Sequence, residues 1–266
     1  MHKSPKSPGR LLSLIRWELE KTFRFPTLAI IIAVVLYIFV PLDFGGSSVP
    51  SQVPSLDSLK NRFASTLTTA LSQHIPASFM YSVFIIAALA ANSVSRDMSS
   101  GYMRVLLSYP IGRTKFFLSK ILVLLAVPFL IFMCSLLFVA ALVSPGLFSY
   151  LDPLSVTYII VVMLVQMFFI LAISLSTSLH IKQPVMSFLS SIITLISIEQ
   201  ISNYLSAPYK YLLPTNSTQL LLDYYISPRT FNYTPSDTLM SLFGLLIIPA
   251  LITALNIVYF KWRFQT

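Results

Sequence analysis

Charged residues are scarce in this sequence. They make up 10% of its 266 residues, whereas hydrophobic residues make up 56%. Soluble domains carry about a quarter charged residues, and a soluble fold has no way to bury this much apolar surface. The composition therefore excludes an ordinary soluble domain and predicts an integral membrane protein.

Cysteine, histidine and glycine are also scarce, which excludes several kinds of enzyme site. Cys134 is the only cysteine, so the chain can form neither an intrachain disulfide nor a thiolate metal site. The three histidines are scattered, and the sequence holds no His-Glu-x-x-His or Gly-x-Ser-x-Gly motif. None of the seven glycines precedes a Lys-Ser or Lys-Thr pair, which excludes a P-loop. We expect no catalytic residues, no metal site and no cofactor bound by this chain.

Six long apolar stretches predict six transmembrane helices. Their apolar residues run continuously rather than alternating with polar ones, which favours helices over barrel strands. The expected fold is an all-α transmembrane domain over residues 10–266, preceded by a disordered tail at 1–9. Pro128 and Pro249 are expected to kink the third and sixth helices. The stretches are 27–42, 77–95, 117–143, 154–179, 185–204 and 239–260.

The distribution of lysine and arginine predicts the orientation. Fourteen of the 18 cations fall on one side: thirteen at the termini or in the loops after the second and fourth stretches, and Lys120 at the start of the third stretch. The other four are Lys60, Arg62, Lys210 and Arg229. The positive-inside rule then places both termini in the cytoplasm of a multi-pass plasma-membrane protein. Because the basic residues cluster at the ends of apolar stretches, the net charge of +9 does not indicate a nucleic-acid partner. Residues 1–26 lack the apolar core of a signal peptide.

Helices outside the spans are predicted as well. The segment RLLSLIRWELEKTFRFP, from residue 10, places leucines on one face and Arg16, Glu20 and Arg24 on another, as an interfacial amphipathic helix does. Residues 58–74 read as an amphipathic external helix, and we expect a further helical segment in the outer loop 205–238. That loop holds two sequons, at Asn216 and Asn232, which are either glycosylated or unmodified surface asparagines.

Two polar residues inside the apolar stretches are candidates for a polar pathway. Glu199 is the one acidic residue within the six stretches. It is either a proton or cation relay or a carboxyl near the outer end of its helix that pairs with Asn203 or Gln200 or reaches water. Gln166 lines a pathway or forms an interhelical hydrogen bond, and the serines and threonines nearby suit close helix packing.

The stretch RDMSSGYMRVLLSYPIGRTK, residues 96–115, is a dense basic island between the second and third apolar stretches. Residues 97–107 predict a short helix with Met103, Leu106 and Leu107 on its apolar side. Gly101 would allow a close backbone approach, and Pro110 ends the helix. A plain positive-inside anchor is the alternative, but cations alone would suffice for that.

This island resembles the ABC type 2 permeases, the membrane subunits of export-type ATP-binding cassette transporters. Their pattern between helices 2 and 3 is acidic-x-x-x-Gly-Thr-Leu-x-x-Leu-Leu-Ser-x-Pro-hydrophobic-x-Arg, with a Lys about seven residues on. The chain departs from it at Tyr102 and Met103, and has Asp where Glu is common. The matching residues are Asp97, Gly101, Leu106 or Leu107, Ser108, Pro110, Ile111, Arg113 and Lys120. The N-terminal amphipathic helix with Glu18 and the six-helix layout extend the resemblance.

The resemblance implies a permease that pairs with itself or a relative and is driven by separate ATP-binding cassette ATPase subunits. Those subunits would bind ATP and Mg and dock on the island, the coupling helix. The ATPase contacts it implies are Arg96, Asp97, Gly101, Tyr102, Arg104, Pro110 and Arg113. Two alternatives stay open: an ion- or proton-coupled secondary transporter that uses Glu199, and a non-transporting membrane scaffold.

Overall fold

The computed structural model describes residues 9–22, 79–108, 112–143, 153–207, 209–226 and 234–263. Within these ranges the regular elements are helices and helical turns, without a strand. Among the described residues, five helices are long and apolar enough to cross a membrane: Phe79–Ser99, Arg113–Cys134, Thr157–His180, Pro184–Ser202 and Pro235–Arg263. The predicted all-helical membrane class is confirmed at this level. The expected first span (27–42), the external helix at 58–74 and residues 1–8 of the tail lie outside the described residues.

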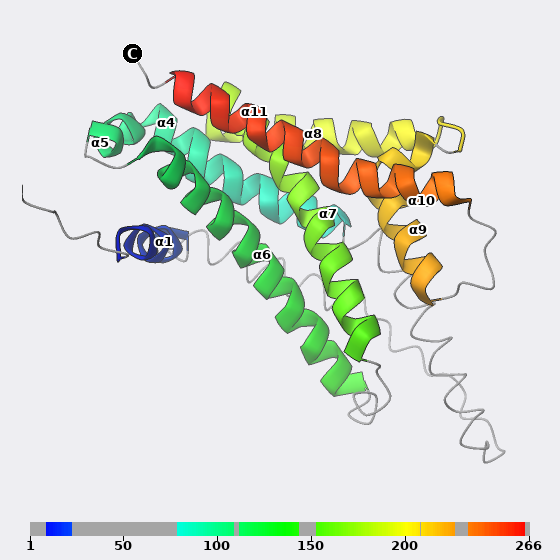
Figure 1. The fold of residues 1–266 in the computed structure, drawn as a ribbon. Helices are drawn as coiled ribbons and strands as arrows, with labels where there is room; N and C mark the ends of the chain where they lie inside the picture. Colours follow the sequence, from blue (N-terminus) through cyan, green and yellow to red (C-terminus); the bar gives the residue numbers. More distant parts are fainter. Residues whose placement is uncertain are drawn as a thin grey trace, which may run out of the picture.

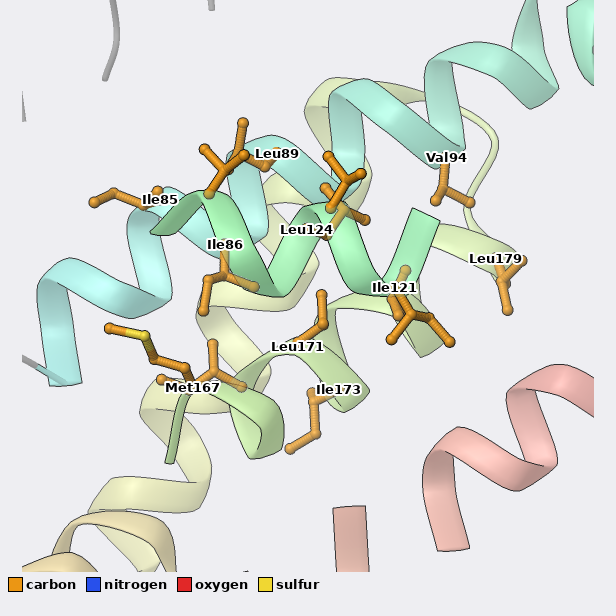
Figure 2. Packing of buried hydrophobic residues seen from close by; sticks show 14 of the residues in the cluster. Ile85, Ile86, Leu89, Val94, Ile121, Leu124, Met167, Leu171, Ile173 and Leu179 are labelled. Carbon is orange, nitrogen blue, oxygen red and sulfur yellow. The ribbon is translucent and has the colours of Figure 1, made fainter. Parts of the chain in front are cut away.

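Three helices supply most of the main core: the span Phe79–Ser99, α6 (Arg113–Val143) and α7 (Pro153–His180). Figure 2 shows their aliphatic side chains meeting between the helices. Three fully buried alanines, Ala87, Ala90 and Ala172, lie among them. Small side chains let helix backbones approach closely, which matters in lipid because burial of apolar surface does not by itself favour helix association there.

The remaining spans pack on α7 (Figure 1). One is α8 (Pro184–Ser202); the other comprises α10 (Pro235–Leu242), the π-helical turn η4 (Phe243–Ile247) and α11 (Ile248–Arg263). Asn256 Nδ2 donates to Ala172 O at 3.1 Å, and Arg263 donates to Leu179 O. Two hydrogen bonds therefore connect α11 to α7, at different positions along the helices. These two spans are the least buried of the five.

The two prolines behave differently. Helix α6 contains Pro128 without a break in the helix. Pro249 follows η4, where the N–H of Ile248 bonds to Phe243 O, five residues back. A proline nitrogen carries no hydrogen and cannot donate a helical hydrogen bond, so the regular hydrogen-bond pattern is already interrupted where η4 widens the helix.

A second, smaller core lies at the opposite end of α7 from the main one. Between α8 and α10 the chain forms η3 (Tyr209–Leu212) and α9 (Pro214–Ile226), and α9 packs leucines against Ile159, Val162 and Met163. Tyr158 Oη donates to Leu221 O at 2.9 Å. Gly244 lets η4 approach the backbone of η3 closely, because a Cβ at this position would lie 2.4 Å from Leu212 O.

Candidate functional site: a buried ion cluster at the α4–α5 end

Lys120 is the centre of the site. Its side chain on α6 is fully buried, and its Nζ lies 2.6 Å from Glu18 Oε1 and 2.9 Å from Asp97 Oδ2. Glu18 belongs to α1 (Gly9–Thr22) and Asp97 to α4 (Arg96–Ser99), which continues the second span. A buried ammonium is tolerated only with close acceptors around it. The three residues therefore join three segments that are far apart in the sequence.

Further groups complete the surroundings of Lys120. Its Nζ donates to Ser93 O at 3.1 Å and Ser93 Oγ at 3.0 Å, and it lies 5.2 Å from the centre of the Phe116 ring. An ammonium has three donors, and oxygens from α1, α4 and the turn before α4 surround it. We call Lys120, Glu18, Asp97 and Ser93 the Lys120 cluster.

Local sequence explains why these side chains meet. On α6, Phe116, Lys120, Leu124 and Val127 recur at helical spacing, and all four are buried. The second span passes through a π-helical turn, η1 (Ala91–Ser95), in which the N–H of Arg96 bonds to Ala91 O. Such turns disturb the helical register and are frequent at functional sites. Here η1 supplies Ser93, four residues before Asp97.

The predicted amphipathic N-terminal helix is present as α1, and its place at the membrane interface stays a prediction. Leu14, Ile15 and Leu19 are partly buried against the main core, and α1 packs on α6. Arg16 and Glu20 are exposed and form an ion pair at 3.0 Å. The apolar face of α1 thus contacts protein, and Glu18 enters the cluster from that face.

The basic island forms two helices rather than the single one predicted over 97–107. α4 ends at Ser99, and α5 runs from Tyr102 to Ser108. Between them Gly101 has φ +72°, and a Cβ built there would meet nothing within 4 Å. The backbone conformation, rather than a close approach by any described segment, therefore accounts for this glycine.

α5 has a buried and an exposed side. Met103 is buried and Leu106 and Leu107 are partly buried against the core, as predicted. Tyr102, Arg104 and Val105 are exposed. The Tyr102 ring also stacks on Trp17 of α1, with 5.9 Å between ring centres. Tyr102, Arg104 and Val105 are called the α5 face below.

The expected ATPase contacts divide into two groups. Arg96, Tyr102 and Arg104 are exposed, Gly101 and Arg113 are partly exposed, and Pro110 lies outside the described residues. Asp97 requires a correction. It is 3% exposed and bonded to Lys120, so it holds the island from inside and cannot itself form part of a contact surface.

The sequence alone assigns no function to Lys120 or Glu18 beyond their part in the resemblance to the permeases. A signal was present, since a lysine inside the apolar stretch 117–143 requires a partner. The sequence did not indicate which residues would provide it.

The two candidate pathway residues have different surroundings. Gln166 is buried in α7, and its Nε2 has no hydrogen bond within the described ranges. Glu199 is partly buried in α8 and lies beside Thr215, in the first turn of α9. A carboxylate near a helix N-terminus interacts favourably with the backbone N–H groups there. Thr215 is therefore a local partner of Glu199 that the sequence did not indicate, and both interpretations of Glu199 stay open.

The remaining site predictions concern modification and metal. Asn216 is partly buried in the first turn of α9, where Thr218 Oγ1 donates to Pro214 O at 2.6 Å. Asn232 lies outside the described residues. No group of three His, Cys, Asp or Glu side chains is placed to hold a metal ion in the part of the chain that the structure describes.

No protein-family model matches this chain, and no curated protein matches it either.

Proposed function

We propose that this chain is the membrane-spanning permease subunit of an ATP-binding cassette exporter in the plasma membrane. Separate ATPase subunits dock on the α5 face, both termini lie in the cytoplasm, and the permease pairs with a second copy or a relative. The observation that carries the proposal is the α4–α5 element, exposed on one side and fixed by the Lys120 cluster on the other.

An element that transmits force needs these two properties together. The α5 face offers a cation, Arg104, and an aromatic ring, Tyr102, to a partner, which suits electrostatic steering and register. Its base is held by Met103 in the core and, through α4, by Lys120. A plain positive-inside anchor needs cations alone, so the buried cluster supports a mechanical role for the island.

The surface of α8 supports pairing with a second subunit. Ser197 and Gln200 are exposed on this span in the single chain, and both lie within the apolar stretch 185–204. Polar groups on spanning helices usually face protein or a water-filled path rather than lipid. A second permease subunit across α8 would give these groups such surroundings.

The proposal is tested by co-purification. We expect the wild-type permease to retain a P-loop ATPase through purification, and the double substitution Arg104→Glu and Arg113→Glu to lose most of it while still inserting. Lys182→Glu is the matched control, because Lys182 is an exposed cation on another turn. Equal ATPase recovery and equal substrate-stimulated ATP turnover with the double variant would contradict this docking site.

A further inference from the structure

We propose that Ser95 is a positioning residue that passes displacement of the α4–α5 element to α8. The inference rests on the proposed function, because that function supplies the force on α4–α5. It deepens that function by naming the connection through which the α5 face reaches the second half of the bundle.

Ser95 connects the second span to the turn between α7 and α8. Its side chain is fully buried, and its Oγ lies 3.0 Å from Ser178 O and 2.8 Å from Ile181 O. The last carbonyls of a helix lack donors within the helix. Ser95 thus provides a cap for the end of α7 from a helix more than 80 residues earlier in the chain.

The same π-helical turn is held from two sides. Ser93, inside η1, and Asp97, two residues after it, bond to Lys120 and so connect to α6 and α1. Ser95 connects to the α7–α8 turn. Because α4 continues directly from η1, any displacement of α4 displaces both connections.

Hydroxyl pairs then connect that turn to α8. Ser178 Oγ and Ser187 Oγ lie 2.9 Å apart, and Thr177 Oγ1 bonds to Ser191 Oγ. These bonds hold the beginning of α8 to the end of α7, so we expect the two helix ends to move together. Chains of bonded and packed side chains of this kind can carry coupling between distant sites.

The functional test measures the separation of α6 and α8. Spin labels at Leu118→Cys and Ile193→Cys, both exposed positions, would be placed in a Cys134→Ser background. With the ATPase bound, we expect ATP and Mg to shift this distance, and Ser95→Ala to reduce the shift by at least half. Ser119→Ala is the control, because Ser119 is equally buried but bonds within its own helix, to Phe116 O.

The outcomes separate the two proposals. No ATP-dependent shift in the wild type would contradict the proposed function. A wild-type shift that Ser95→Ala leaves unchanged would overturn the role of Ser95 alone.

A second measurement needs no partner. In the isolated permease, we expect Ser95→Ala to speed amide hydrogen exchange at residues 181–190 at least threefold and to leave α1 unchanged, whereas Lys120→Met should speed exchange in α1. Unchanged exchange at 181–190, or equal effects of both variants on α1, would also overturn the inference.

Discussion

Lys120 carries an ammonium group that is fully buried, so its position depends on the groups that the fold places around it. Removing an ammonium from water costs several kcal/mol, and close carboxylates must offset that cost. Glu18 and Asp97 do so at 2.6 and 2.9 Å. Because one partner sits on α1 and the other on α4, the same cation that is costly to bury also fixes the relative position of these helices.

Lys120→Met tests this directly. The substitution conserves the apolar part of the side chain but leaves two buried carboxylates without their cation, so we expect a loss of about 3–5 kcal/mol in stability. Thermal unfolding in detergent would measure it. Lys115→Met, at an exposed lysine five residues earlier on α6, should change stability little. Equal melting temperatures for the two variants would contradict a structural role for the cluster.

At the scale of elements, turn geometry shapes the α4–α5 unit. Gly101 adopts a left-handed conformation that costs other residues about 1–2 kcal/mol. Gly101→Ala should therefore destabilise the unit and weaken ATPase retention, although space for a methyl group exists. Gly112→Ala, where a Cβ would make only ordinary contacts, is the control. If both variants melt and bind alike, the conformation of Gly101 is not what shapes the island.

A different physical limit applies at Gly244. A Cβ there would lie 2.4 Å from the backbone oxygen of Leu212, which a small rotamer change cannot relieve. We expect Gly244→Ala to push η3 away from the last span and to speed amide exchange over 209–226 severalfold. Exchange in α1, at the other end of the molecule, should stay as in the wild type. Unchanged exchange in η3 and α9 would mean that the close approach is not maintained in the membrane.

Spans such as α7 and α8 could be predicted because a long apolar segment in lipid must form its backbone hydrogen bonds internally, which an α-helix does. The stretches 154–179 and 185–204 correspond closely to α7 (Pro153–His180) and α8 (Pro184–Ser202). The Lys120 cluster could not be predicted in this way. Periodicity indicates which residues share a face of one helix, but not which faces meet, and Glu18, Asp97 and Lys120 come from three separate segments.

The π-helical turn at Ala91–Ser95 shows a second limit of the sequence. Its sequence, ANSVS, consists of small residues that also occur in regular helices, and nothing in its composition indicates a wider turn. The turn follows from the bonds that Ser93 and Ser95 make to other helices. Tertiary contacts thus decide the local geometry of this turn.

At the scale of the whole molecule, the proposed orientation places the α4–α5 end and the outer end of α8 on opposite sides of the membrane. Val105→Cys and Tyr204→Cys, each in a Cys134→Ser background, sample these two ends at exposed positions. A membrane-impermeant maleimide applied to intact cells should label position 204 at least tenfold more than position 105. Permeabilised cells should give equal labelling, and preferential labelling of position 105 in intact cells would reverse the orientation.

The most direct test of the permease assignment is a photo-crosslink from the α5 face. A photoreactive amino acid would replace Val105, which is exposed beside Arg104, and a control would replace Leu122, exposed on α6 within the span. We predict that position 105, but not position 122, crosslinks in cells to a protein that carries a P-loop, and that the double substitution Arg104→Glu and Arg113→Glu removes this product. A product from position 105 that contains no P-loop protein would contradict the assignment.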